Sequence, residues 1–384
     1  IKDLFGVPKM PIFAGTRSPL PETFETPGPV VDACLRQMGV VMGKTHTVEF
    51  AFGGVGTNAH WGTPKNPWSP DVHRVPGGSS AGAGVSLCEG SALVALGTDT
   101  AGSVRIPASA TGNVGLKTTI GRWSMEGIVP LSPTLDTAGI LTRTVADAAY
   151  AFSALDPVEG WPNAPRLAPI DLGDVRLAIP EKPFWLDCSP GVAEITKAAI
   201  DELATAGAQL RSVRLPDLEA LQSVFEKGAL TAVQLYHYLQ ASLPDALERL
   251  DDNVRRRLTD AGALPAAEYL RRRDLMAQAV TDANAALADG VILASPTLAI
   301  TPPRLDELEA PGVYRTKNLL MLRNTSMPSL LGLCALSIPI GLDNEGMPVG
   351  LQLAARGGDD LRLLRVGLAV EALLGTNRLA RPTP

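Results

Sequence analysis

Apolar positions along the chain follow two spacings that alternate through most of its length. Short apolar runs typical of buried strands occur at 40–43, 92–96, 115–117, 175–179, 209–213, 291–296, 335–340 and 349–353. Helical spacing occurs at 29–38, 81–88, 144–155, 189–206, 317–331 and 359–373, and through most of 218–287, where it is broken near Pro244 and Pro265. The alternation predicts an α/β protein.

Two segments rich in glycine and serine lie within the stretch 76–117. They are Gly77–Gly82, which leads into a predicted buried helix, and Gly97–Ser103, which follows a predicted buried strand. Glycine lets a backbone approach another group closely, because it has no side chain and tolerates positive φ. Ligands of open α/β sheets usually bind beyond the strand ends. Each segment is therefore predicted to form one wall of a pocket.

Two other interpretations of these segments stay open on the residues alone. A glycine-rich turn before a helix can bind phosphate, although the Gly-Lys-Ser/Thr ending of a P-loop and the Gly-x-Gly-x-x-Gly spacing of a dinucleotide site are both missing. Alternatively, the glycines permit close packing and the serines cap helices.

Composition narrows the classes of function. The 384 residues, 45% of them hydrophobic, can form one large domain or two ordinary ones. A net charge of −6 argues against autonomous binding of nucleic acid or an anionic membrane. No apolar run approaches the length of a membrane span of ~18 residues. The four cysteines lack metal-binding spacing, so no metal site is predicted, and a reducing cytoplasm is the expected compartment.

The combined pattern of the two segments resembles the amidase signature family of serine hydrolases. That family pairs Gly-Gly-Ser-Ser-Gly with Gly-Thr-Asp-x-Gly-Gly-Ser-x-Arg-x-Pro, and its two catalytic serines lie 24 positions apart, as Ser79 and Ser103 do here. The resemblance covers nearly the whole chain, with further matching segments at 1–3, 43–45, 115–118, 135–139, 335–339 and 348–352. Ala81 and Ala101 replace usual glycines of the motif.

The resemblance implies an α/β/α layered fold with a large, mixed, twisted sheet between helices. It implies a single amidase domain over residues 1–384, with the signature core at about 52–160 and a helical, cap-like insertion at about 218–287. Because family members carry a helical segment before the catalytic lysine, the native N-terminal segment is expected to be missing from this chain.

The same resemblance implies a catalytic set of Lys2, Ser79 and Ser103. Ser103 would attack the carbonyl carbon, Ser79 would receive the proton of Ser103, and Lys2 would act as the base. Ser79 would also follow a cis peptide bond. Lysine can do so only when neutral, and burial among apolar residues can bring its pKa down toward neutrality. No metal or organic cofactor is required.

Two further groups of residues are expected around this set. The backbone N–H groups of the nucleophile loop form the natural oxyanion hole, and they belong to Thr100, Ala101, Gly102 and Ser103. Asp99 and Arg105 flank Ser103 and are expected to pair, which would fix the loop.

A glycine-rich loop at 50–70 is read as too polar for the core, and in the resembled fold it approaches the pocket. Phe52, Gly53 and Gly54 are therefore candidate substrate-binding residues, with a merely packed loop as the alternative. Arg323 is a candidate for binding a substrate carboxylate, and a surface salt bridge is the alternative. The nearby histidines at 46, 60 and 73 have no carboxylate partner that the sequence assigns, and a structural role is expected.

The leading prediction for function is an amidase that hydrolyses a carbon–nitrogen amide bond of a small substrate through a seryl acyl-enzyme. The alternatives are a glutaminase component similar to the A-type polypeptide of tRNA-dependent amidotransferases, and a non-catalytic anion-binding protein. The expected partner is a small-molecule amide, and a homodimer is an open alternative to the monomer.

Overall fold

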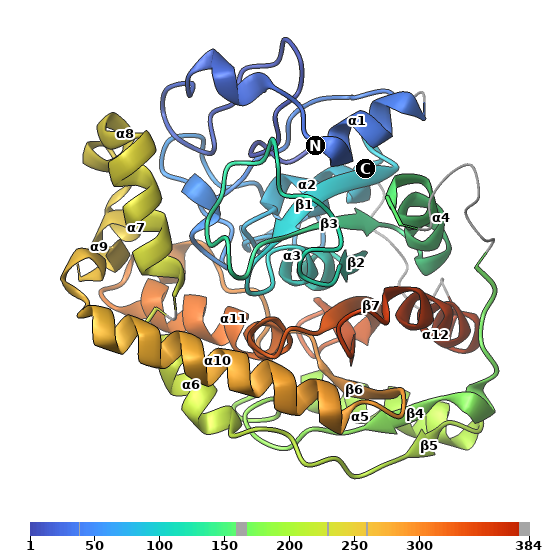
Figure 1. Cartoon of the computed structure of the whole chain (residues 1–384). Coiled ribbons are helices and arrows are strands. Elements are labelled where there is room, and N and C mark those ends of the chain that lie inside the picture. Colours follow the sequence, from blue (N-terminus) through green and yellow to red (C-terminus); the bar gives the residue numbers. More distant parts are fainter. Residues whose placement is uncertain (38, 159–166, 229, 259, 376–384) are drawn as a thin grey trace.

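A mixed sheet of eight strands forms the centre of the protein (Figure 1). This computed structural model describes residues 1–37, 39–158, 167–228, 230–258 and 260–375. The strands are β1 (Val94–Asp99), β2 (Val114–Lys117), β3 (Thr137–Thr142), β4 (Arg176–Ala178), β5 (Gln209–Leu210), β6 (Val291–Pro296), β7 (Cys334–Leu342) and β8 (Pro348–Ala355). They lie in the order β1-β3-β2-β7-β8-β6-β4-β5. Pairing is antiparallel from β1 through β6 in that order and parallel from β6 through β4 to β5.

Helices cover both faces of the sheet, as predicted for an α/β/α fold. They are α1 (Pro29–Arg36), α2 (Ala81–Cys88), α3 (Arg105–Ala110), α4 (Val145–Leu155), α5 (Val192–Thr205), α6 (Leu218–Glu226), α7 (Thr231–Ser242), α8 (Pro244–Glu248), α9 (Asp252–Leu258), α10 (Ala266–Ala286), α11 (Val313–Leu330) and α12 (Asp360–Leu374). One group, α2, α3 and α11, packs against β1, β2, β7 and β8, and a second group, α4, α5 and α12, packs on the other side. Strands covered on both faces have continuous apolar runs, and β2, β3, β6 and β8 are buried along their whole length.

The insertion predicted at 218–287 consists of helices α6 to α10, and both predicted breaks occur. Pro244 is the first residue of α8, and Pro265 directly precedes α10. Proline lacks a backbone N–H and therefore starts helices more readily than it continues them. In Figure 1, α10 crosses in front of α11, while α7, α8 and α9 lie together at one side of the molecule.

In the N-terminal half, two predictions of local structure are wrong, and one predicted strand is present with different bounds. Residues 40–43 form no strand, and Val40 and Met42 are 82% and 76% exposed, because the chain leaves α1 along the surface. The strand predicted at 92–96 begins at Val94 and continues into the glycine-rich segment as far as Asp99. The loop at 50–70 contains buried core residues, among them Phe50, although it forms no long regular element.

Other local predictions are confirmed. The side chain of Thr144 accepts a hydrogen bond from the Asp147 N–H and caps α4. The predicted surface connection at 160–172 lies partly outside the described residues.

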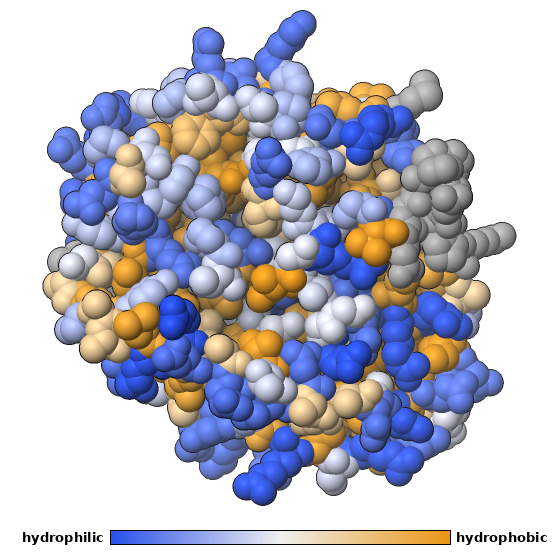
Figure 2. Space-filling model, viewed as in Figure 1, coloured by the Kyte–Doolittle hydropathy of each residue, from blue (hydrophilic) through white to orange (hydrophobic). Residues whose placement is uncertain are grey.

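On the face seen in Figure 2, apolar residues are scattered among hydrophilic ones. Within the described ranges, no helix combines the length and apolarity that crossing a membrane requires.

Candidate active site

Lys2 enters the interior because the first residues of the chain lie against β1. The Lys2 N–H donates to the Leu96 carbonyl at 3.0 Å, and Lys2 also pairs with Thr45 in a parallel bridge. Its side chain is fully buried. Lys2 Nζ lies 2.7 Å from Ser79 Oγ and 2.7 Å from Thr98 Oγ1, so the predicted lysine and the first predicted serine are in direct hydrogen-bond contact.

Burial changes the acid–base chemistry of this lysine. Removing the ammonium from water lowers the pKa of Lys2 from its ordinary value of 10.5 to about 7, while the negative charges of Asp136 and Asp99 oppose this change. Its two close partners are hydroxyl groups, which give much less support to the charged form than a carboxylate would. A substantial fraction of Lys2 is therefore neutral near pH 7 and able to accept a proton.

Ser79 lies where the first glycine-rich segment meets three other parts of the chain. The Gly78–Ser79 peptide bond is cis, as expected from the resemblance. The Ser79 carbonyl accepts a hydrogen bond from the Val48 N–H at 3.2 Å, and the Ser80 N–H donates to the Ser103 carbonyl at 3.3 Å. The second bond brings together the two segments that carry the predicted serines.

The loop that carries Ser103 connects β1 to α3 and is fixed by a buried ion pair. Asp99 Oδ1 accepts from Arg105 Nη2 at 2.8 Å, and Asp99 Oδ2 accepts from Arg105 Nε at 3.0 Å, so the predicted pairing is confirmed. Burial alone would raise the pKa of Asp99, but the charge and hydrogen bonds of Arg105 outweigh it and hold that pKa below its ordinary value. Arg105 Nη1 also donates to Gln352 Oε1 at 2.6 Å, which attaches the loop to β8.

Gly102 is the position in this loop where only glycine fits. Its φ is +132°, and a Cβ placed on it would lie 2.0 Å from Thr325 Oγ1. Thr325 belongs to α11, and its hydroxyl donates to the Ala101 carbonyl at 2.7 Å. The close approach of α11 therefore orients the peptide between Ala101 and Gly102.

One of the four N–H groups of the predicted oxyanion hole already has a partner inside the loop. The Gly102 N–H donates to Asp99 Oδ1 at 2.7 Å and is therefore already engaged within the loop. The roles of Thr100, Ala101 and Ser103 as oxyanion donors stay predictions. Sequence reasoning missed this distinction because the motif does not show which N–H groups the loop uses internally.

A second buried carboxylate supports the loop from the opposite side. Asp136 Oδ1 accepts from Thr100 Oγ1 at 2.6 Å, and its Oδ2 accepts from the N–H groups of Leu131 and Ser132. Burial raises the pKa of Asp136 to about 6, although these bonds and the charge of Lys2 act in the opposite direction. Thr100, the first predicted oxyanion residue, is thus held through its side chain.

The three candidate substrate-binding residues at 52–54 lie between the Ser79 segment and α11. The Gly54 carbonyl accepts from the Gly78 N–H at 2.8 Å, and the Gly54 N–H donates to Asn318 Oδ1 at 2.8 Å. A Cβ on Gly54 would lie 2.6 Å from Leu322 Cγ. The structure therefore brings Phe52, Gly53 and Gly54 to the catalytic segment, and their contact with substrate stays a prediction.

Arg257, in α9 of the insertion, is a candidate site residue that sequence reasoning missed. Its guanidinium lies over the Phe52 ring, 3.9 Å from Cζ to the ring centroid, and its Nη1 donates to the Phe52 carbonyl. A Cβ on Gly53 would lie 3.7 Å from Arg257 Nη1 and 3.1 Å from the Tyr314 hydroxyl. Burial lowers the pKa of Arg257, and in the described part of the chain no carboxylate pairs with it. Its helical phase, three residues after buried Val254, was the available signal.

Arg323 is buried and therefore takes no part in the surface salt bridge that was its alternative. It is 5% exposed, its Nε donates to Asn324 Oδ1 at 3.3 Å, and its Nη2 donates to the Leu186 carbonyl. Leu322 and Thr325 share the face of α11 that meets Gly54 and Ala101, and helical spacing turns Arg323 away from that face. Burial lowers the pKa of Arg323. Its contact with a substrate carboxylate stays a prediction, and the geometry favours Arg257 for that role.

One histidine has a partner that the sequence did not assign. His60 Nε2 lies 3.1 Å from Glu49 Oε1. Among the residues described, no three His, Cys, Asp or Glu side chains gather into a group that could hold a metal ion.

A buried lysine bonded to one serine, a second serine on a glycine-rich loop and an α/β/α core form the arrangement that the resemblance to serine–serine–lysine amide hydrolases predicts. The chain belongs to the Amidase family, whose family model matches residues 1–364. It is therefore an amide hydrolase, as predicted, in a family that is characterised by this catalytic set.

Similar proteins cover nearly the whole chain. The chain is 52% identical to 2-amino-5-chloromuconic acid deaminase of Comamonas testosteroni, over 98% of this chain and 81% of that protein. It is 34% identical to the A-type polypeptide of glutamyl-tRNA(Gln) amidotransferase of Nitratidesulfovibrio vulgaris, over 96% and 81% of the two proteins. A crystal structure of an amidase superposes with a TM-score of 0.82 at 31% identity, over 97% of this chain and 83% of that chain.

Proposed function

We propose that this amide hydrolase releases ammonia from a small, carboxylate-bearing substrate, with Ser103 as nucleophile, Ser79 as proton shuttle and Lys2 as base. The observation that carries the proposal is the 2.7 Å contact between Lys2 Nζ and Ser79 Oγ, in surroundings that lower the pKa of Lys2 to about 7. An alkyl hydroxyl is a weak nucleophile at neutral pH and needs such a base.

On an amide substrate, the first half of the reaction forms a covalent acyl-enzyme and the second half hydrolyses it. Ser103 Oγ attacks the carbon of the C–N bond while its proton passes to Ser79, whose own proton passes to neutral Lys2. The negative charge that develops on the substrate oxygen is received by the N–H groups of Thr100, Ala101 and Ser103, and each such donor contributes about 3 kcal/mol to stabilising the transition state.

The second half returns the enzyme to its starting state. Ser79 gives a proton to the nitrogen as the C–N bond breaks, and ammonia leaves. Water then attacks the seryl ester, the relay accepts the proton of that water, and Ser103 recovers its own proton as the acid product leaves. Lys2 is neutral again at the end of the cycle, so no cofactor is consumed.

The substrate class follows from Arg257 and from one relative. The half-buried Arg257 guanidinium, which has no carboxylate partner among the described residues, is suited to bind a carboxylate of the substrate. The relative that is 52% identical is a deaminase of a muconic acid, which carries two carboxyl groups. We therefore propose 2-aminomuconic acids as the substrate class, with Arg257 binding one carboxylate and Arg323 retained as a candidate for the other. The nitrogen of such an acid is on C2 and not on a carbonyl carbon, so Ser103 adds to C2 of the imine tautomer while the relay passes the Ser103 proton to the nitrogen. Ammonia then leaves, water adds to C2, and release of Ser103 with its proton restored leaves the 2-oxo acid.

A glutaminase component of an amidotransferase is the second candidate function, because the similarity to the A-type amidotransferase polypeptide covers 96% of the chain. Glutamine also carries a carboxylate that Arg257 suits. This candidate predicts ammonia release from glutamine and stable association with other polypeptides, whereas the leading proposal predicts full activity of the isolated chain. Size-exclusion chromatography separates these outcomes and also distinguishes a monomer from the alternative homodimer. The cytoplasm stays the predicted compartment.

The deciding experiment measures ammonia release from 2-amino-5-chloromuconic acid, glutamine and indoleacetamide by the purified chain. The proposal predicts the highest kcat/KM for the muconic acid. A higher kcat/KM for uncharged indoleacetamide would contradict the carboxylated substrate class, and a higher value for glutamine would favour the second candidate.

A further inference from the structure

The loop at 48–54 connects the helical insertion to the catalytic serines. On one side it contacts the Ser79 segment, through Val48 N–H to the Ser79 carbonyl at 3.2 Å and Gly78 N–H to the Gly54 carbonyl at 2.8 Å. Between these contacts, Phe50 and Ala51 have positive φ values of 47° and 58°. Non-glycine residues adopt such values only where the surroundings hold them.

On its other side the loop is held at two points by the short helix α9. The Asp251 N–H, at the start of α9, donates to Glu49 Oε2 at 2.8 Å. Arg257, near the end of α9, contacts the Phe52 carbonyl and ring. Six residues of helix separate these points by about 9 Å. The position of Arg257 over Phe52 therefore depends on where Glu49 holds the start of the helix.

Glu49 has the burial and the bonding expected of such an anchor. It is only 2% exposed, and each of its carboxylate oxygens has a partner, Asp251 N–H for one and His60 Nε2 for the other. A buried carboxylate is costly unless it is bonded in this way. Its bonds therefore favour one arrangement of the loop and of the start of α9.

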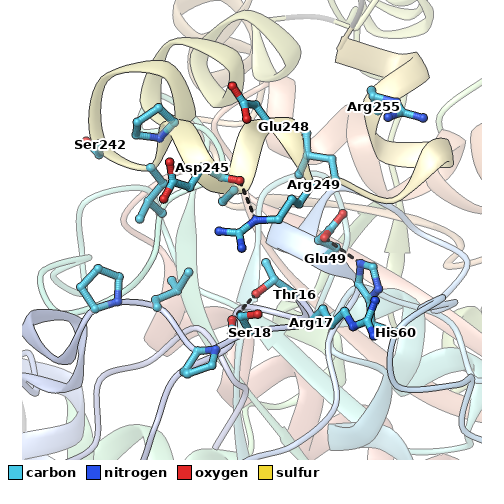
Figure 3. A pocket seen from close by; sticks show the side chains of 17 residues that line it. Thr16, Arg17, Ser18, Glu49, His60, Ser242, Asp245, Glu248, Arg249 and Arg255 are labelled. Atoms are coloured by element: carbon cyan, nitrogen blue, oxygen red, sulfur yellow. Dashed lines mark hydrogen bonds and ion pairs between the residues drawn. The ribbon is translucent and has the colours of Figure 1, made fainter.

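A cavity beside Glu49 separates the N-terminal segment from α8 and from the chain that leads into α9. The cavity measures about 920 Å³, and its walls are residues 16–21, Glu49, His60, 242–246, 248–250 and Arg255. Figure 3 shows the Glu49–His60 pair and Arg249 from the insertion facing the space between the two segments. Val254 and Leu258 pack α9 into the core, and the bond from the Asp251 N–H to Glu49 fixes the start of the helix at the edge of this cavity.

We propose that Glu49 is a positioning residue that holds α9 so that Arg257 recognises a carboxylate of the substrate beside Ser79. This inference rests on the proposed role of Arg257 and adds the residue that sets its position. Glu49 itself does not contact the substrate. Its loss weakens recognition of carboxylated substrates selectively, because the Lys2–Ser79 contact involves no atom of Glu49.

The test compares kcat/KM for 2-amino-5-chloromuconic acid with kcat/KM for uncharged indoleacetamide in a set of variants. Glu49→Ala is expected to lower the ratio of these values about tenfold, which is the size of one lost hydrogen bond to a charged group. Glu49→Gln keeps an oxygen for the Asp251 N–H and is expected to stay within about threefold of the unmodified protein. Glu248→Ala, at an exposed residue on the same cavity wall, is the matched control and should leave the ratio unchanged.

A double-mutant cycle distinguishes positioning from general damage. If Glu49 acts through Arg257, Glu49→Ala has no further effect on the ratio in the Arg257→Ala background. Should Glu49→Ala fail to fold, His60→Ala removes only one partner of the carboxylate and is expected to lower the same ratio by about threefold, again only while Arg257 is present.

The outcomes separate this inference from the proposed function. An unchanged ratio in Arg257→Ala would contradict carboxylate recognition by Arg257. If Arg257→Ala lowers the ratio but Glu49→Ala or His60→Ala leaves it unchanged, the positioning role of Glu49 is overturned and carboxylate recognition by Arg257 stands. The same conclusion follows if the effects of Glu49→Ala and Arg257→Ala on the ratio are additive in the double variant.

Discussion

The catalytic segments at 76–142 and the helical insertion at 218–286 are built in opposite ways. In the first region the polar side chains are buried and bonded, as in Asp99–Arg105 and Thr100–Asp136, and glycines bring backbones into contact. In the second, most charged residues are exposed and pair along the helix surface, as Arg271 does with Glu268. Arg257 is different, because it extends from the insertion to the loop beside the catalytic serines. We infer that the first region carries out the reaction and that the second selects the substrate.

The largest effect is expected from Ser103→Ala in the catalytic region. Loss of the nucleophile should lower kcat by roughly 10³-fold or more for every substrate, because no other group can form the covalent intermediate. Intact-mass spectrometry during turnover should detect a seryl adduct in the unmodified protein and none in the variant. Ser91→Ala, at an exposed position, is the control. Substantial activity in Ser103→Ala would mean that the nucleophile is assigned wrongly.

Gly102→Ala should produce the next largest effect, because the added Cβ would lie 2.0 Å from Thr325 Oγ1. The displaced loop should lower kcat about 100-fold, which is the loss expected when the oxyanion donors move out of position. Gly90→Ala has a similar demand for positive φ, at +76°, but no atom lies within 4 Å of the new Cβ. It should lower Tm without changing kcat. An equal loss of kcat in the two variants would show that the contact of α11 with Gly102 is not what holds the loop in its active position.

Arg257→Ala tests the insertion and should affect KM more than kcat. KM for 2-amino-5-chloromuconic acid is expected to rise about 10- to 100-fold, the range for losing a charge-assisted contact, while KM for indoleacetamide changes little. Arg256→Ala, at the exposed neighbouring position of α9, is the matched control. A similar rise in KM for both substrates would remove the distinction between the two regions.

Sequence reasoning succeeded for the layers of the fold and for contacts within short motifs. The regular α/β alternation predicted the layers, and the motifs predicted the Asp99–Arg105 pair and the proximity of Lys2 to Ser79. The catalytic roles of Lys2, Ser79 and Ser103 stay predictions. Sequence reasoning failed at residues 40–43, because an apolar run alone does not show whether another segment covers it. Arg257 and the Glu49–His60 pair were missed because their partners are distant in sequence and only the folded chain brings them together.

The central claim is that neutral Lys2 draws a proton from Ser103 through Ser79. It is tested most directly by the pH dependence of Ser103 labelling with a fluorophosphonate, followed by intact mass in the unmodified protein and in Lys2→Met. Because burial lowers the pKa of Lys2 to about 7, Lys2 is protonated and inactive below that pH. The labelling rate of the unmodified protein should therefore rise with pH to a plateau, with a midpoint near pH 7. Lys2→Met should be labelled much more slowly, and its labelling rate should show no such midpoint. Equal labelling rates of the two proteins across this pH range would contradict the account.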